Sequence, residues 1–399
     1  MKHKTLYFGG HIITCNLRDE IAEAMVTEDD KILYVGDYDT AHYLVDADTE
    51  IIHIGGRAII PTFADAHYTV FENKLPQNDY ESRLEEAYIS AVGRGFTAFC
   101  EEGNAGEKAI LALQKSLSEK RLPIRVSSLI KDDEAHPEGT LATCFSACGI
   151  STGFGNSHYK IGQYQMPIEA QNRDALSLGT PFAQFLKHLL SHRISVEFKP
   201  KSRAEAEYAL WCLFYLEKEA NRFLSTKIYL PFSADEEILF LLAKIKTQVI
   251  IPVEALLEAS NQREEILENL TFYQEKNIPF SFSGFTSKQS SVSPFVLLSS
   301  LASKLSKESQ IELYYKHLKT MLRAMTLHGA IAVMQEEISG SLEWGKSADF
   351  LLLSASPFAT SSAEMKNITP LRVVCEGKIL YDAVDTLSAV STVYLRTNE

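Results

Sequence analysis

The sequence predicts an α/β fold, a (β/α)8 TIM-like barrel with a small β-sandwich formed by both termini. Three observations support this prediction: both ends of the chain consist of short β runs, the middle alternates apolar runs with amphipathic stretches, and about eight such units can be counted. We expect residues 1–56 to form the first part of the sandwich, residues 57–338 the barrel, and residues 339–399 the second part of the sandwich.

The two ends of the chain share one pattern. The N-terminal runs are "TLYFGGHIIT", "KILYVGD" and "EIIHIGG", and the C-terminal runs are "ADFLLLS", "LRVVCEGKILYDA" and "STVYLRT". Apolar and polar residues alternate in them, and Gly, Asp and Asn separate the N-terminal runs, as the short strands of a small antiparallel sheet require. The similarity of the two ends predicts that they meet in one β domain.

The middle of the chain supplies the barrel strands. Eight apolar runs recur there: "AIIPTFADA", "GFTAFC", "PIRVSSLI", "HYKIGQY", "ISVEF", "KIYLP", "QVIIPV" and "IPFSFS". Amphipathic stretches such as "RAEAEYALWCLFYLEKEANRFL" separate most of them, which is typical of helices between parallel strands. In such a barrel the active site lies at the C-terminal ends of the strands.

Composition restricts the class of partner. The 399 residues include 39 Lys and Arg against 52 Asp and Glu, a net charge of −13, which disfavours nucleic acid and anionic membranes as partners. The sequence has no apolar run of about 18 residues, and its start lacks the pattern of a signal peptide. A cytoplasmic protein is expected. The six cysteines are scattered, and we interpret the pair in "TCFSAC", Cys144 and Cys148, as small buried residues rather than a metal clip.

Three segments carry a resemblance to a known family. The pattern "GGRAIIPTFADAHYTV" resembles the start of the barrel in the amidohydrolase superfamily, and "LRAMTLHGAIAVMQEEISGSLEWGKSADFLLLSASPF" is similar to its C-terminal signature. The opening "GGHIITCNLRDEIAEAMVTEDDKILYVGD" is similar to its N-terminal β segment. The resemblance points to the branch with N-substituted formamide deformylases. The motif from Gly340 to Asp349 is structural, with Gly345 supplying an unusual backbone angle at a turn.

The resemblance implies hydrolysis of a C–N bond by a metal-bound hydroxide, with zinc or another divalent ion held at the strand ends. By this comparison His67 stands in the place of the first histidine ligand, Thr69 in the place of the second, and Lys160 in the place of a lysine that this branch often has on the fourth strand. The places of the later ligands are taken by Phe198, Ser202, Leu230 and Phe285. We expect the apolar side chains of Phe198, Leu230 and Phe285 to occupy the space of the metal site.

One observation needs no alignment: no histidine occurs between His192 and His317, so the late barrel strands have no imidazole to contribute. His67 is therefore the only retained histidine ligand position. The candidate catalytic residues are His67, Lys160 and Glu101, with Glu101 or its neighbour Glu102 as an ion-pair partner for the lysine.

Two classes of function remain open. In the first, the protein is a hydrolase of C–N bonds with an altered, metal-free site around the three candidates. In the second, it is a pseudoenzyme that kept the fold as a scaffold or a small-molecule binder. The missing ligands favour loss of metal-dependent turnover, so no cofactor is expected, and zinc or another divalent metal is expected only if the family chemistry survives. A small-molecule ligand and a homodimer are the partners that the resemblance suggests.

Overall fold

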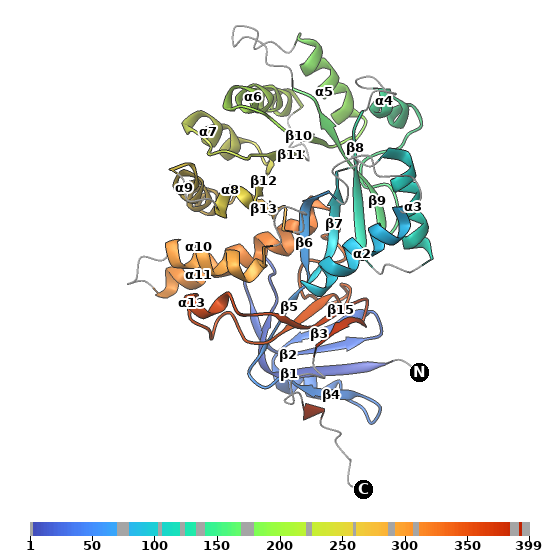
Figure 1. Ribbon diagram of the computed structural model, residues 1–399, viewed down its shortest axis with the longest axis vertical. Coiled ribbons are helices and arrows are strands. Elements are labelled where there is room, and N and C mark those ends of the chain that lie inside the picture. The colour runs from blue at the N-terminus through green and yellow to red at the C-terminus, as the bar shows by residue number, and fades with distance from the viewer. Residues whose placement is uncertain are drawn as a thin grey trace.

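The computed structural model has two parts, a barrel of eight parallel strands and a separate sheet built from both ends of the chain (Figure 1). It describes residues 3–69, 80–102, 106–119, 124–132, 140–168, 179–220, 226–257, 261–285, 292–305, 311–383 and 391–392. The predicted fold class, a TIM-like barrel with a separate sheet from the termini, is confirmed.

The barrel strands follow one another in chain order around the sheet, each parallel to the next. A hydrogen bond of 3.1 Å from the backbone N–H of Gly284 to Asp65 Oδ1 connects the last strand end to the first strand, so the barrel is nearly closed. The strands are β6 (Phe63–Tyr68), β7 (Phe96–Glu101), β8 (Arg125–Ile130), β9 (Tyr159–Met166), β10 (Val196–Phe198), β11 (Thr226–Tyr229), β12 (Gln248–Pro252) and β13 (Phe280–Ser283).

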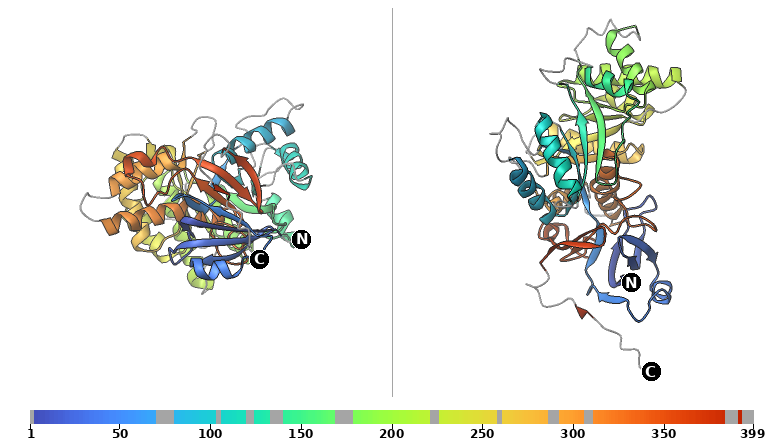
Figure 2. Two further views of the ribbon diagram at one scale, coloured as in Figure 1. Left: turned by 90° about the horizontal axis from the view of Figure 1, so that it is seen from below. Right: turned by 90° about the vertical axis from the view of Figure 1, so that its right-hand side faces the viewer.

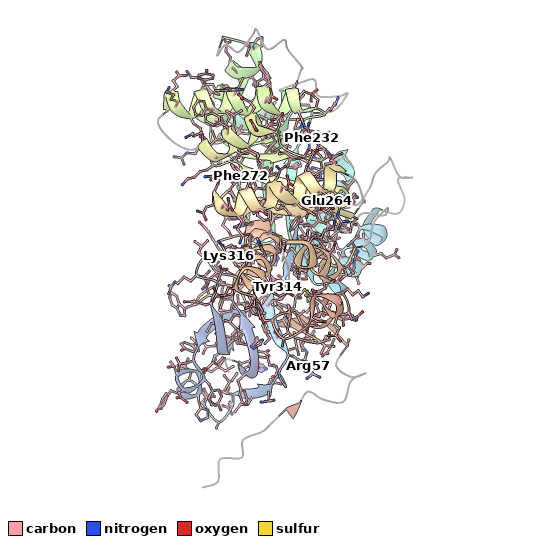
Figure 3. The ribbon with its side chains drawn as sticks, turned by 90° about the vertical axis from the view of Figure 1, so that its left-hand side faces the viewer. Arg57, Phe232, Glu264, Phe272, Tyr314 and Lys316 are labelled. Atoms are coloured by element: carbon pink, nitrogen blue, oxygen red, sulfur yellow. The ribbon has the colours of Figure 1, made fainter. Side chains whose placement is uncertain are left out.

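Helices cover the outside of the barrel. They are α2 (Tyr80–Gly93), α3 (Gly106–Ser118), α4 (Thr140–Ala147), α5 (Pro181–Ser191), α6 (Arg203–Ala220), α7 (Glu236–Lys244), α8 (Glu254–Leu257), α9 (Asn261–Glu275), α10 (Pro294–Leu305) and α11 (Ile311–Met325). The short helix α12 (Leu327–Ala332) instead packs through Ala332 against Ala66 of β6 and Ile250 of β12. Figure 3 shows α9, with Glu264 and Phe272, beside α11, with Tyr314 and Lys316. Gln274 joins these two helices by a 2.9 Å hydrogen bond to Thr320.

Side-chain alternation along each strand separates the barrel interior from the layer under the helices. On β10, Val196 and Phe198 belong to the large apolar cluster that also contains helix residues, and the Phe198 ring lies 6.3 Å from that of Phe182 on α5. Glu197 between them therefore points into the barrel. On β11 the same rule places Ile228 outside and Lys227 and Tyr229 inside.

Strands from both ends of the chain lie side by side in the second sheet, as the views in Figure 2 show. Its core order is β16-β15-β14-β5-β1-β2-β3, so strands from the C-terminal segment pair directly with the segment that leads into the barrel. The bounds are β1 (Lys4–Ile13), β2 (Ile21–Glu28), β3 (Lys31–Gly36), β4 (Glu50–His53), β5 (Ala58–Pro61), β14 (Phe350–Leu353), β15 (Pro370–Cys375), β16 (Lys378–Asp382) and β17 (Ser391–Thr392), with the short helix α1 (Tyr38–Tyr43) beside them. The short helix α13 (Ser362–Met365) packs against α10 of the barrel.

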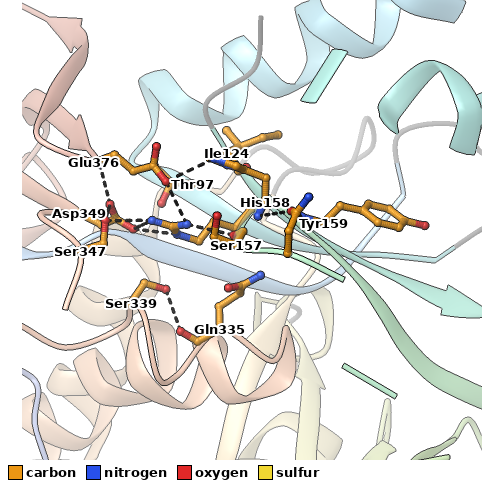
Figure 4. A network of polar contacts seen from close by, with 12 residues as sticks. Thr97, Ile124, Ser157, His158, Tyr159, Gln335, Ser339, Ser347, Asp349 and Glu376 are labelled. Carbon is orange, nitrogen blue, oxygen red and sulfur yellow. Dashed lines mark hydrogen bonds and ion pairs between the residues drawn. The ribbon is translucent and has the colours of Figure 1, made fainter. Parts of the chain in front are cut away.

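A buried ion pair connects the C-terminal signature to the barrel (Figure 4). Arg125, at the start of β8, is almost fully buried, and its Nη2 lies 2.9 Å from Asp349 Oδ2 of the signature motif and 2.9 Å from Ser347 Oγ. Glu376 receives a second contact from the same guanidinium at 3.3 Å. Asp349 thus acts as the structural anchor between the sheet and the N-terminal end of the barrel.

The signature turn agrees with its structural interpretation. Gly345 has φ of +80°, a left-handed conformation that favours glycine, and its N–H bonds to the Ile32 carbonyl at 2.9 Å. The interpretation of Cys144 and Cys148 as buried residues is wrong, because Cys144 on α4 and Cys148 directly after α4 are both exposed. In the part of the chain that the structure describes, no helix meets the length and hydropathy of a membrane span.

Candidate functional site

Four barrel strands, or the residues that directly follow them, bring charged side chains together around His67. The imidazole comes from β6, Glu102 directly follows β7, Glu197 lies on β10 and Lys227 on β11. His67 is 7% exposed, and Glu197 and Lys227 are at most 1% exposed. We call this set, with Lys199 directly after β10, the mouth cluster.

His67 lies between two carboxylates. Its Nε2 is 3.2 Å from Glu197 Oε1, and its Nδ1 is 3.7 Å from Glu102 Oε2. Its backbone N–H donates to Asp65 Oδ1 at 3.2 Å, and the ring lies 5.1 Å from the ring of Tyr229. Because an ionised carboxylate only accepts hydrogen bonds, Nε2 carries the proton that it shares with Glu197. The buried carboxylate therefore orients the imidazole, with Nδ1 on the side of Glu102.

Glu197 is held ionised inside the protein. Its Oε2 lies 2.9 Å from Lys227 Nζ, and its Oε1 accepts a 2.9 Å hydrogen bond from Gln165. Burial raises the pKa of Glu197, but Lys227 and His67 outweigh burial and hold that pKa well below its ordinary value. Burial likewise opposes the charge of Lys227, yet its neighbours Cys100 and Glu197 hold the pKa of the ammonium above its ordinary value. Both members of the pair are therefore charged.

Glu102 forms an ion pair with a second lysine, Lys199. Lys199 Nζ donates to Glu102 Oε1, and the same ammonium lies 5.2 Å from the centre of the Tyr229 ring. Thr69, in the place of the second histidine, donates a 2.8 Å hydrogen bond from Oγ1 to Glu102 Oε2. Burial raises the pKa of Glu102, but His67 and Lys199 lower it below its ordinary value overall. The mouth cluster thus contains two lysine–carboxylate pairs, one on each side of the His67 imidazole.

Of the three residues selected from the sequence, the structure places only His67 in this cluster. Lys160 lies near the start of β9, where its Nζ donates to the Met334 carbonyl at 2.6 Å. Glu101 receives a 3.3 Å hydrogen bond from Tyr88 of α2, on the helix side of the barrel. The expected pairing of Lys160 with Glu101 or Glu102 is absent from the described contacts of these residues, which are made with other groups.

The apolar residues expected to fill the metal site lie elsewhere. Phe198, Leu230 and Phe285 belong to the apolar cluster shared with the helices, and the Phe285 ring lies 5.2 Å from that of Phe96. The expectation is wrong because the comparison by position selected the wrong face of β10. Strand alternation in "VEF" and "KIY" is the signal that could have found Glu197 and Lys227, since a charged residue between apolar ones in a buried strand faces the barrel interior.

The residues of the mouth cluster do not fit a divalent metal. A zinc site takes three or four nitrogen, oxygen or sulfur donors, and within the described ranges no group of three or more His, Cys, Asp or Glu side chains could hold a metal ion. Glu197 and Glu102 are the carboxylates beside the imidazole, and each is engaged by a lysine ammonium. Those two positive charges repel an incoming cation and satisfy the carboxylates that would bind it.

Comparison with known proteins finds one family model that matches part of the chain. Residues 312–381 match the model of the Amidohydrolase family, which spans α11, the signature motif and strands β14 to β16, but none of the mouth cluster. No curated protein matches the sequence.

Solved structures share the fold over nearly the whole chain. An uncharacterized metal-dependent hydrolase from Pyrococcus horikoshii OT3 has a TM-score of 0.67 at 13% identity, covering 90% of this chain and 99% of that one. Guanine deaminase from E. coli has a TM-score of 0.63 at 13% identity, covering 96% and 99%. An adenosine deaminase from Xanthomonas campestris with bound zinc has a TM-score of 0.61 at 13% identity, covering 94% and 92%. At these identities the likeness concerns the fold.

Proposed function

We propose that this chain does not perform metal-dependent hydrolysis and instead binds a small molecule at the barrel mouth. The match of residues 312–381 to the Amidohydrolase family model and the shared fold support a place in the amidohydrolase superfamily. The superfamily hydrolyses C–N bonds and generally uses a divalent metal such as zinc. The single observation that carries the proposal is that each carboxylate beside His67 is paired with a lysine.

The location of the binding site follows from the architecture. TIM barrels bind their ligands at the C-terminal ends of the strands, where Lys199, Tyr229 and Glu102 lie. The Lys199 side chain is 37% exposed, whereas Lys227 and Glu197 beneath it are closed off from solvent. A ligand at the mouth would therefore meet Lys199 and the partly buried Tyr229 ring before it meets the deeper pair.

Turnover measurements test the proposal. The purified protein is assayed against a panel of N-acyl and N-formyl amides, with and without added zinc, manganese or iron, alongside a zinc-dependent deaminase of the same fold as a positive control. We expect no hydrolysis in any condition. Metal-stimulated hydrolysis that disappears in His67→Ala would refute the proposal.

A second function is favoured by one specific contact, the 3.2 Å pairing of His67 Nε2 with the buried Glu197 carboxylate. A buried carboxylate that orients an imidazole is the arrangement of a general base in metal-free hydrolysis. On this reading His67 Nδ1 takes a proton from a nucleophile at the mouth. Hydrolysis that survives a chelator and is lost in both His67→Ala and Glu197→Gln would establish this alternative.

The remaining expectations concern the cellular location, the partners and the oligomeric state of the protein. We propose a cytoplasmic protein without nucleic-acid or membrane partners, which the net charge of −13 supports. The homodimer suggested by the family resemblance stays a prediction, and sedimentation analysis of the purified chain would test it.

A further inference from the structure

A bulge in β1 forms a cavity in the sheet that is built from both ends of the chain. In the pairing of β1 with β2, Phe8 lies opposite Ala24 and Ile12 opposite Ala22, so the three residues of β1 between them face only Glu23. The cavity at this bulge has a volume of about 450 Å³. Small-molecule sites have volumes of about 300–1,000 Å³, so the cavity is large enough for one.

Two glycines fix the shape of the bulge. Gly9 has φ of +80°, a left-handed conformation, and a Cβ atom on it would lie 2.3 Å from His53 Nε2. A Cβ atom on Gly10 would lie 2.2 Å from the Arg57 carbonyl oxygen. This close approach lets the Gly9 carbonyl accept a 2.7 Å hydrogen bond from the N–H of Gly56. The neighbouring segment therefore holds the bulge in place, and the cavity needs no ligand to form it.

Two aromatic rings contribute to the cavity wall. Phe8 of β1 and Tyr38 at the start of α1 both line it, and both are half-buried. Their ring centres lie 5.0 Å apart with the planes inclined by 38°. The Phe8 ring also lies 5.0 Å from the His53 ring, nearly perpendicular to it, so packing fixes its position. The face of such a ring attracts a cation.

Glu23 supplies a negative charge beside these rings. Its exposed side chain accepts a 3.1 Å hydrogen bond at Oε2 from the backbone N–H of Tyr38. Among the described residues no Lys or Arg side chain pairs with Glu23, and none lines the cavity. His11 also lines the cavity, and its Nδ1 is hydrogen-bonded to Ser356 Oγ at 2.6 Å. The carboxylate of Glu23 is therefore available to a ligand.

We propose that this cavity binds a small organic ammonium ion, whose apolar part packs against Phe8 and Ile21 and whose charge lies near the aromatic rings and Glu23. A cation gains attraction from both the rings and the carboxylate. An anion would be repelled by Glu23, and a neutral apolar molecule would displace water from the carboxylate without replacing its hydrogen bonds. The site is separate from the proposed function, because none of its residues belongs to the mouth cluster.

Choline and its neutral analogue, in which a carbon atom replaces the nitrogen, test the proposal. The two molecules have the same shape, so a difference in affinity reports the charge. Saturation-transfer NMR of their methyl protons measures binding to the full chain at millimolar concentrations. We expect choline to bind about fivefold more tightly than the analogue, as for a half-exposed ion pair. Equal affinities, or no binding of choline, would overturn the proposal.

Two variants locate the binding. Glu23→Gln removes the charge but keeps an oxygen that accepts the Tyr38 N–H, and it should weaken choline binding about fivefold without affecting the analogue. Tyr38→Leu removes one ring and should weaken choline binding about threefold. Glu219→Gln is the matched control, since it makes the same charge change at an exposed carboxylate of α6 outside the cavity. We expect it to bind choline as the wild type does.

The variants also define the results against the proposal. Choline affinity that is unchanged in Glu23→Gln and Tyr38→Leu would overturn it, because the ion would then bind elsewhere. Equal weakening in Glu219→Gln and Glu23→Gln would overturn it as well, because the effect would then come from the net charge of the protein. If Tyr38→Leu does not fold, Glu23→Gln and the neutral analogue decide the outcome.

Discussion

The pair of Lys227 and Glu197 makes a quantitative prediction about stability. Lys227→Met removes the ammonium and leaves a buried carboxylate, a change that typically costs about 3–5 kcal/mol. Glu197 keeps its contacts with His67 at 3.2 Å and Gln165 at 2.9 Å, so its charge is not left without donors. We therefore expect the lower end of the range, about 3 kcal/mol, or roughly a hundredfold in the unfolding equilibrium.

Urea unfolding followed by tryptophan fluorescence measures this effect. Trp211 reports the barrel, because it lies on α6 and donates a 2.9 Å hydrogen bond to Glu237 of α7. The double variant Glu197→Gln/Lys227→Met should recover about half of the loss, since no charge is then left buried. Lys199→Met, at the half-exposed lysine, is the control, with an expected loss of about 0–1 kcal/mol.

Two results would refute this reasoning. If Lys227→Met loses less than about 1 kcal/mol, the ammonium does not hold the charge of Glu197. If the double variant is as unstable as the sum of the single variants, the two side chains do not interact across the 2.9 Å contact.

Three further predictions concern other parts of the molecule. Thr69→His alone should not create zinc binding in equilibrium dialysis, because the lysine paired with the neighbouring carboxylate remains. Asp349→Ala leaves Arg125 buried without its main partner and should lower the free energy of unfolding by about 3–5 kcal/mol in urea, with Asp349→Asn losing less; equal stability of Asp349→Ala and wild type would contradict the anchor role. The folded-state pKa of Glu197 is depressed, so its stabilisation is present above the unfolded value of about 4.3 and is lost as pH falls through the lower folded value. Thermal unfolding below about pH 4.3 should therefore show a steeper loss of stability in wild type than in Glu197→Gln, and parallel curves would count against the depressed pKa.

The barrel could be predicted because its strands are apolar runs spaced by amphipathic helices. All eight predicted runs overlap a barrel strand, although the first run also contains β5, which pairs with β1 and β14 of the other sheet. The signature could be predicted as structural because Gly345 marks a left-handed turn. The barrel strands and the turn at Gly345 depend on local residue patterns, which can be identified in the sequence without knowing the tertiary structure.

The site could be predicted only in part, because its residues depend on which face of a strand points inward. The family pattern places Phe198 at a metal-ligand position. In the structure Val196 and Phe198 face the helices, so Glu197 between them faces the barrel interior. Lys160 lies outside the mouth cluster for a different reason. It stands five residues before Gln165 on β9, about 16 Å along an extended strand, so it reaches the opposite end of the barrel from His67.

The pairing of charges could not be predicted from the sequence. Glu197 and Lys227 are thirty residues apart and lie on different strands. Their side chains meet because β10 and β11 pair in the register that places Glu197 opposite Lys227, and a shift of one residue would separate them. Lys199 could equally have been a solvated lysine after a short strand. The structure shows instead that it binds Glu102 and lies against Tyr229.

The metal content of the wild-type chain tests the central claim most directly. The protein is produced in medium supplemented with zinc, manganese and iron, purified without chelators, dialysed to equilibrium against zinc and measured by elemental analysis beside His67→Ala. The lysine-paired carboxylates predict far less than one equivalent of any metal, with no difference between the two proteins. About one equivalent in the wild type that is lost in His67→Ala would contradict the account.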